Sequence, residues 1–224
     1  RLRAGWRLLA QFALLALFMV ILVLVDSALA ALLAGSPWGQ GGGILLPLET
    51  LAAMLLSVWI AGRFIDRRRF ADFGFRFGPA WWADLGFGLA LGALLMALIF
   101  LAEWGTGWAV ITEAPRRGGS DTPLLVDILI ALVTFICVGI YEELLSRGYH
   151  LKNLSEGLNL KALSPRAATL LAVLATSTAF GVMHAANPNA SLVSTVGLVL
   201  AGLLYATAYA LTGELAIPIG YHIA

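Results

Sequence analysis

Six apolar stretches of about 20 residues recur along the chain, and they constrain its fold more than any other feature. They cover Leu8–Leu33, Ile44–Ile65, Trp82–Leu101, Leu124–Leu145, Ala167–Met183 and Val193–Leu211. A stretch of this length is enough for a helix to cross the hydrocarbon layer of a bilayer. Charged residues make up only 12% of the chain, against about a quarter in soluble domains, and the mean hydropathy is +0.90. The sequence therefore predicts an all-α, polytopic bundle of transmembrane helices.

The two ends of the sequence bear on domain organisation. The chain begins with Arg1 rather than Met, and a seventh apolar stretch opens at Leu215 and is cut off at Ala224. We therefore expect a segment of a longer protein, truncated at its C-terminus. No internal repeat is evident and the loops are short, so residues 1–224 are predicted to form a single integral-membrane domain.

Basic residues gather in alternate loops. Arginines precede the first apolar stretch, follow the second between Arg63 and Arg76, and flank the turn after the fourth together with Lys152 and Lys161. The alternate loops carry only Arg116 and Arg117. By the positive-inside rule, the N-terminus and the basic loops face the cytoplasm. We expect a multi-pass protein of the plasma or inner membrane that contacts membrane lipid and binds no nucleic acid.

Adjacent carboxylates at Glu142 and Glu143 interrupt the fourth apolar stretch. A charged side chain near the bilayer centre costs about 3 kcal/mol even on lenient scales, so such a pair indicates a functional site by default. Neighbouring helix residues point about 100° apart, which predicts different roles for the two glutamates. Arg147 follows Glu143 by four residues, the spacing at which an acid and a base pair on one helix face. Glu142 is then free to face a polar cavity as a general base, although a purely structural ion network is the alternative.

Two of the three histidines also fall within predicted spans. His184 ends the fifth span and His222 lies in the seventh apolar stretch, whereas His150 is predicted to snorkel from a cytoplasmic helix end. One histidine in a span is as often a packing residue as a catalyst. A glutamate and two histidines on three separate helices nevertheless form a candidate site.

These residues carry a resemblance to a known family. The run Glu142–Arg147 resembles the Glu-Glu-x-x-x-Arg motif of the CAAX protease and bacteriocin-processing (CPBP) family, also called Abi. Phe180–His184 is similar to its Phe-x-x-x-His motif, and Leu215–His222 to the approach to its His-x-x-x-Asn motif. The Asn of the third motif would fall two residues beyond Ala224. The resemblance covers residues 124–224, and the first three spans share only their hydrophobicity with the family.

The resemblance implies an intramembrane endopeptidase, built as a bundle of roughly seven to eight helices with a cavity open to the cytoplasmic side. Glu142 would activate the attacking water with help from His184, and His222 would stabilise the oxyanion. The substrates would be membrane-associated peptides or protein tails, with or without a prenyl group. The predicted catalytic residues are Glu142, Glu143, His184 and His222, supported by Arg147 and Phe180. The oligomeric state stays open.

Alternative chemistries use the same residues. Glu142, His184 and His222 could supply the three protein ligands of a catalytic zinc. The chain lacks the His-Glu-x-x-His helix of many zinc proteases, so we predict no cofactor and keep zinc as the alternative. A non-catalytic membrane scaffold or bacteriocin-immunity protein is a second alternative. An ion-coupled transporter would need internal repeats with broken helices, and we find no repeat.

Three further features predict local structure. Gly88 and Gly92 form a Gly-xxx-Gly pair, which favours ordinary close packing of helices, and the aromatic segment Phe70–Trp82 is predicted to lie at the membrane interface. Counted from the turn near Ser155–Ser164, Glu142 lies roughly 18 Å along the fourth helix and His184 roughly 28 Å along the fifth. The fifth helix should therefore be tilted, or begin lower than the fourth ends.

Overall fold

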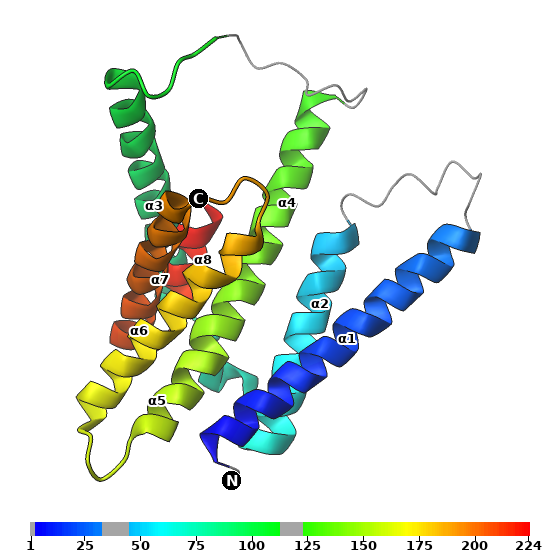
Figure 1. The fold of residues 1–224 in the computed structure, drawn as a ribbon, viewed down its shortest axis with the longest axis vertical. Coiled ribbons are helices and arrows are strands. Elements are labelled where there is room, and N and C mark those ends of the chain that lie inside the picture. Colours follow the sequence, from blue (N-terminus) through cyan, green and yellow to red (C-terminus); the bar gives the residue numbers. More distant parts are fainter. Residues whose placement is uncertain (1–2, 33–44, 113–122) are drawn as a thin grey trace.

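The fold is a bundle of helices. The computed structural model describes residues 3–32, 45–112 and 123–224 (Figure 1). In chain order the α-helices are α1 (Ala4–Leu32), α2 (Leu45–Ile60), α3 (Pro79–Gly105), α4 (Leu124–Glu143), α5 (Lys152–Leu158), α6 (Pro165–Met183), α7 (Leu192–Thr212) and α8 (Ala216–Ile223). Within the described residues, six helical segments are long and apolar enough to cross a membrane. The six predicted spans and the all-α bundle are thereby confirmed.

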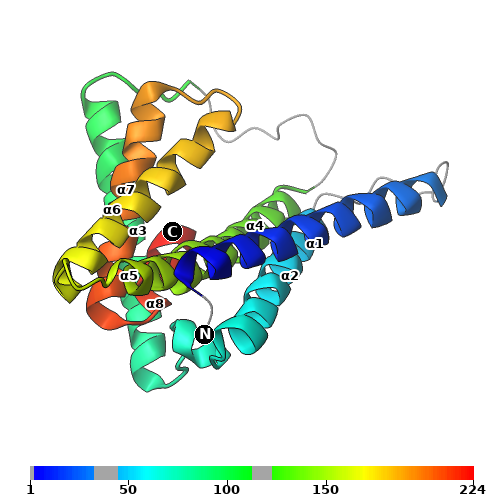
Figure 2. The same cartoon turned by 60° about the horizontal axis from the view of Figure 1, so that its bottom comes forward.

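The helices run alternately up and down along the chain. α1 and α2 lie together on one side of α4, while α3, α6 and α7 lie on the other (Figures 1 and 2). The short helix α8 lies inside the bundle, where it packs on α3, α4 and α7. The N-terminus, the segment between α2 and α3 and the turn between α5 and α6 lie at one end, which we call the basic end. The opposite loops at 36–43 and around Arg116 and Arg117 lie largely outside the described residues.

A π-helix interrupts the long fourth span. Residues Leu144–Leu151 are π-helical and join α4 to α5 without a break in the helix. Such wide turns are rare and occur often at functional sites. This one carries Arg147, so its geometry sets where that guanidinium points. Hydrophobic periodicity did not predict it, because apolar residues occupy most faces of this span.

Local capping fixes where the last helices begin. The hydroxyl of Ser164 accepts a hydrogen bond from Ala167 N at 3.2 Å, and Pro165 occupies the first helical position of α6. Ser191 caps α7 in the same way, with Ser194 N donating at 3.1 Å. α7 ends at Gly213, whose φ of 69° suits glycine. The Ser164 cap fixes the start of α6, which leads to His184, and the turn at Gly213 precedes α8, which carries His222.

Glycines bring α3 and α8 into close contact. A Cβ atom on Gly88 would lie 2.4 Å from Ile217 O, and one on Gly220 would lie 2.4 Å from Leu85 O. Gly92 is similarly close to Tyr221 O, at 2.8 Å. The predicted packing role of the Gly-xxx-Gly pair is therefore confirmed. The contact also has a functional consequence, because it fixes the helix that carries His222.

α6 is inclined to α4 in both views, which confirms the predicted tilt of the fifth span (Figures 1 and 2). The end of α6 nevertheless approaches the end of α4, because His184 Nε2 lies 3.8 Å from Glu142 Oε2. In this way His184, near the end of the fifth span, meets Glu142, which lies well inside the fourth.

The aromatic segment before α3 differs in part from its predicted place at the interface. Phe77 and Trp82 are exposed, as expected of interfacial aromatics, but Phe73, Phe75 and Trp81 are buried. Trp81 Nε1 donates to Gly74 O at 3.0 Å. The buried rings pack into the protein core because the turn Phe70–Phe73 folds back against the π-helix.

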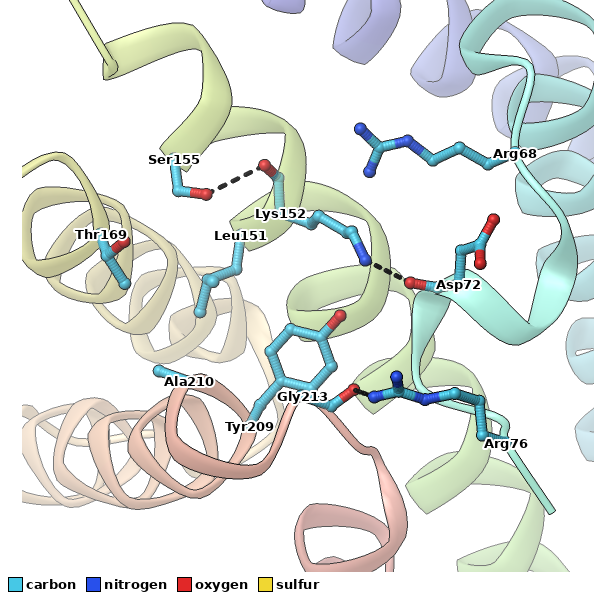
Figure 3. A pocket seen from close by; sticks show the side chains of 10 residues that line it. All are labelled: Arg68, Asp72, Arg76, Leu151, Lys152, Ser155, Thr169, Tyr209, Ala210 and Gly213. Carbon is cyan, nitrogen blue, oxygen red and sulfur yellow. Dashed lines mark hydrogen bonds between the residues drawn. The ribbon is translucent and has the colours of Figure 1, made fainter. Parts of the chain in front are cut away.

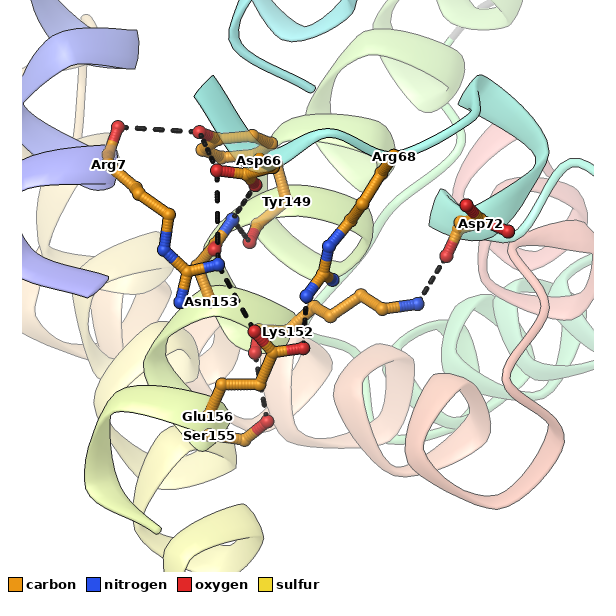
Figure 4. Close-up of polar contacts among 9 residues, drawn as sticks. All are labelled: Arg7, Asp66, Arg68, Asp72, Tyr149, Lys152, Asn153, Ser155 and Glu156. Carbon is orange, nitrogen blue, oxygen red and sulfur yellow. Dashed lines mark hydrogen bonds and ion pairs between the residues drawn. The ribbon is translucent and has the colours of Figure 1, made fainter. Parts of the chain in front are cut away.

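A polar cluster ties α1 to the other elements at the basic end (Figure 4). Glu156 pairs with Arg7 at 3.1 Å and also with Arg68. Deeper in, Asn153 Nδ2 donates to Asp66 Oδ2 at 3.0 Å. Because Arg7, Arg68, Asp66 and Asn153 are buried, this cluster has few alternatives to its internal partners. It holds the start of α1 against α5.

Candidate active site

Glu143 is the buried centre of the site. Its side chain is fully buried, and Oε1 accepts from Arg147 Nη1 at 2.9 Å. The same oxygen lies 2.8 Å from Nδ1 of His222. The pairing of Glu143 with Arg147, predicted from their spacing, is confirmed.

Arg147 links three helices. Beyond Glu143, its Nη2 donates to Gly202 O of α7 at 3.2 Å. Its guanidinium also lies over two aromatic rings, 4.4 Å from the ring centroid of Phe180 and 5.0 Å from that of Tyr205. Both contacts are cation–π interactions, which gain strength when desolvated. Arg147 thus balances the charge of Glu143 and fixes α6 and α7 relative to the π-helix.

Glu142 points away from that pair and toward the two histidines. Its Oε2 lies 3.8 Å from His184 Nε2 and 3.7 Å from His222 Nε2. These distances are longer than direct hydrogen bonds. Oε2 is buried and has no hydrogen-bond partner among the described residues. The two neighbouring glutamates therefore occupy different environments, as their angular separation on the helix predicts.

Neighbouring groups orient both imidazole rings. His184 Nδ1 lies 2.7 Å from Phe180 O, and a carbonyl oxygen can only accept, so Nδ1 carries the hydrogen. For the same reason His222 Nδ1 donates to the Glu143 carboxylate. In each neutral ring the lone pair then lies on Nε2, the nitrogen that faces Glu142. The site therefore directs two acid–base nitrogens at one carboxylate.

A largely apolar cavity of about 200 Å³ adjoins Glu142 and His184. Its wall includes Phe12 of α1, Met54 of α2 and Phe180 of α6. Of the four predicted catalytic residues, Glu142 and His184 line this cavity. Glu143 and His222 do not line this cavity, because they bind each other behind Glu142.

His150 also differs from the expectation. It was predicted to snorkel toward solvent, but it lines the same cavity. Its Nε2 lies 2.9 Å from Gln11 Oε1, and its ring packs on Phe12 with centroids 4.6 Å apart. Gln11 in turn donates to Ser57 at 3.2 Å. The π-helix and the packing of α1 bring this histidine inward, and neither is evident in the local sequence.

Tyr205 is a site residue that the sequence did not indicate. Its ring stacks on that of His222, with centroids 5.1 Å apart and an interplanar angle of 12°. It therefore contacts both His222 and Arg147. A tyrosine within an apolar helix gives no signal that separates such a role from ordinary packing.

Residues 124–224 match the family model described as "Type II CAAX prenyl endopeptidase Rce1-like". This match supports the resemblance of residues 124–224 to the CPBP family. No curated protein and no solved structure matches the chain. The CPBP region begins with α4 and holds the six residues that were predicted to form the site, and the structure brings all six together. At family level the CPBP match identifies a CAAX-protease-like intramembrane endopeptidase.

The candidate zinc ligands are Glu142, His184 and His222. Among residues 3–32, 45–112 and 123–224, no group of three or more His, Cys, Asp or Glu side chains is arranged to hold a metal ion. The two nitrogens nearest to Glu142 Oε2 are nevertheless imidazole Nε2 atoms, a donor type that binds zinc. Zinc therefore remains a competing proposal.

Proposed function

We propose that the protein hydrolyses peptide bonds by a glutamate mechanism, in which Glu142 acts as the general base. The observation that supports this most is the position of Glu142 Oε2, within 3.8 Å of two imidazole Nε2 atoms and beside an apolar cavity. The spacing suits a water-sized reactant shared by the three groups. Peptide hydrolysis needs such a water, a base to deprotonate it and a positive donor for the oxyanion.

In this mechanism the Glu142 carboxylate removes a proton from water while the water oxygen bonds to the scissile carbonyl carbon. His184 Nε2 orients that water. The carbonyl π bond opens and its electrons move to oxygen, which becomes the oxyanion. When the tetrahedral intermediate collapses, the C–N bond breaks and Glu142 returns the proton to the leaving nitrogen. The products are one carboxylate terminus and one amine terminus.

His222 would stabilise the oxyanion in its protonated form. Its Nδ1–H is held by the buried Glu143 carboxylate, so Nε2 faces the site, and the hydrogen that Nε2 carries in the protonated ring is a donor toward the oxyanion. Arg147 balances the charge of Glu143, and the guanidinium of Arg147 packs on the ring of Phe180. Glu143 would thus act by positioning His222.

The substrate would be a membrane-associated peptide or protein tail. The mostly apolar cavity supports a hydrophobic segment next to the scissile bond. The concentration of arginine and lysine at the basic end supports a cytoplasmic orientation of that end in the plasma or inner membrane. On this reading the substrates are tails that lie at the cytoplasmic leaflet, with or without a prenyl group.

The test is cleavage of fluorogenic tail peptides, prenylated and unprenylated, by the protein in liposomes. Glu142→Gln should lower kcat at least about 10²-fold, the contribution of a general base, without changing thermal stability. Glu103→Gln, at an exposed carboxylate far along α3, is the matched control and should retain activity. Turnover that survives a metal chelator supports the glutamate mechanism.

Two outcomes would favour the alternatives. Activity that is lost with chelator and restored by zinc would assign Glu142, His184 and His222 to metal binding. Equal turnover by wild type and Glu142→Gln would remove Glu142 from the chemistry. No turnover by wild type on either peptide would instead favour a non-catalytic scaffold or immunity protein, in which the buried network of Glu143, Arg147 and His222 retains the motifs for stability.

A further inference from the structure

A second pocket, of about 450 Å³, opens at the basic end of the bundle (Figure 3). Its lining comes from the segment before α3, from α5 and from the far end of α7, and comprises Arg68, Asp72, Arg76, Leu151, Lys152, Ser155, Thr169, Tyr209, Ala210 and Gly213. Lys152 lies ten positions after Glu142 on one continuous helix. No residue of this basic pocket lines the cavity beside Glu142.

Arg68 provides a buried cation with spare donors. Only 8% of the residue is exposed, and its Nη2 pairs with Glu156. Its Nε and Nη1 have no hydrogen-bond partner within the described part of the chain. Glu156 is shared with Arg7, so one carboxylate faces two guanidinium groups. Unsatisfied charged donors are costly to bury, which makes an anionic acceptor at this wall favourable.

Lys152 adds a second cation. Its Nζ donates to the main-chain oxygen of Asp72, an acceptor without net charge (Figure 3). The Asp72 carboxylate is used elsewhere, because Oδ2 accepts from Arg69 N at 2.9 Å and caps its own turn. The pocket therefore holds an ammonium group whose hydrogen bond to Asp72 goes to the backbone and not to the carboxylate.

Arg76 completes the set at the rim. It pairs with Glu214 while remaining largely exposed, and Glu214 does not line the pocket. The lining thus carries three cationic side chains and one carboxylate, that of Asp72. This carboxylate already accepts a hydrogen bond from Arg69 N. An arginine fork combined with a lysine is a donor set that suits phosphate oxygens.

We propose that this pocket binds the phosphate of an anionic membrane lipid. Exposed aromatic side chains close to Arg76 in the sequence support a lipid as the source. Phe77, next to Arg76, and Trp82 are exposed aromatic side chains of the kind that lies at headgroup level. Basic pockets between transmembrane helices at the cytoplasmic surface bind anionic headgroups in this way. The proposal does not depend on peptidase activity.

Native mass spectrometry of the detergent-purified protein, titrated with phosphatidylglycerol or phosphatidylcholine, tests it. Wild type should retain phosphatidylglycerol in preference to phosphatidylcholine. Lys152→Gln and Arg76→Gln should each weaken phosphatidylglycerol binding about fivefold, and the double variant more, because each cation near the surface contributes on this scale. Arg68→Gln is avoided as the main variant, because Arg68 also holds Glu156. Thermal unfolding checks that the variants remain folded.

Lys161→Gln is the matched control. Lys161 is exposed in the turn before α6 at the same end, outside the pocket, and its loss should leave binding unchanged. An equal loss in Lys161→Gln and Lys152→Gln would assign binding to general surface charge and overturn the proposal. Equal retention of the two lipids would overturn it as well. Displacement of phosphatidylglycerol by millimolar inorganic phosphate would identify a site for soluble anions and contradict the assignment to lipid.

Discussion

His222 Nδ1 lies 2.8 Å from Glu143 Oε1, although 79 positions separate the two residues in the chain. The contact joins the first and third CPBP motifs through a carboxylate that Arg147 already pairs. It explains why a fully buried glutamate adjoins one that faces a cavity. In the proposed mechanism Glu143 orients the histidine, and Glu142 contacts the reactants.

The Glu143–Arg147 ion pair predicts that substitutions of the two residues have non-additive effects on the free energy of unfolding. Arg147→Met leaves the buried Glu143 without its guanidinium and should lower the free energy of unfolding by about 3–5 kcal/mol. Adding Glu143→Gln to Arg147→Met should restore part of that loss, because the uncompensated charge is removed. Denaturant unfolding of the four proteins in detergent micelles measures the coupling. Strict additivity would show that the two side chains do not interact.

The contact of Gly88 with α8 predicts an effect of substitution on both stability and activity. In Gly88→Ala the new methyl group would meet Ile217 O at 2.4 Å, a backbone atom that can yield only if α8 moves. We expect a destabilisation of about 1–3 kcal/mol and a lower kcat, because α8 carries His222. Thermal unfolding and the liposome assay measure the two effects.

Gly86→Ala is the control for that prediction. Gly86 lies on the same helix, and a Cβ atom there has no heavy atom within 4 Å. Alanine should be neutral or slightly stabilising at this position, because it favours the helix. A similar loss in both variants would trace the effect to α3 itself and not to its contact with α8.

Tyr205 offers a test of a role that the sequence did not indicate. Tyr205→Phe keeps the ring that stacks on His222 and lies under Arg147, so activity should be within about twofold of wild type. Tyr205→Leu removes both ring contacts and should lower kcat by about tenfold or more through a misplaced His222. Measuring kcat and KM separately distinguishes the two cases. A loss confined to KM would place Tyr205 in substrate binding instead.

The sequence predicted those features of the fold and site that depend on local spacing. The six spans follow from the length of the apolar runs, and the Glu143–Arg147 pair follows from four-residue spacing on a helix. The tilt of α6 followed from comparing how far Glu142 and His184 lie along their helices. Each of these rests on helix geometry, which local sequence determines.

The features that could not be predicted depend on contacts between distant segments. The inward position of His150 requires α1 to supply Gln11, and the stacking of Tyr205 requires α8 to supply His222. The π-helix that turns Arg147 toward Gly202 has no periodic signature in an apolar run. Phe73 and Trp81 were expected at the interface because composition alone does not separate a buried aromatic from an interfacial one.

The anchoring of α1 by Glu156 leads to a final prediction. Glu156 is the carboxylate that Arg7 and Arg68 share, and α1 supplies Phe12 to the cavity beside Glu142. Glu156→Gln should lower the free energy of unfolding by about 1–3 kcal/mol, because the buried Arg68 guanidinium loses its carboxylate and Arg7 keeps only Asp66, at 3.9 Å. It should also raise KM more than it lowers kcat, since the cavity wall shifts while the catalytic groups stay in place.

Limited proteolysis should show earlier cleavage near the start of α1 in Glu156→Gln, because Arg7 then loses its carboxylate contact with α5. Glu103→Gln, at an exposed site on α3, is the control for the loss of one negative charge and should behave as wild type. If Glu156→Gln lowered kcat with KM unchanged, the cluster at the basic end would act on the catalytic groups themselves. The π-helix would then connect the cluster to the catalytic groups, because it carries both Arg147 and Tyr149, and Tyr149 O accepts a hydrogen bond from Asn153.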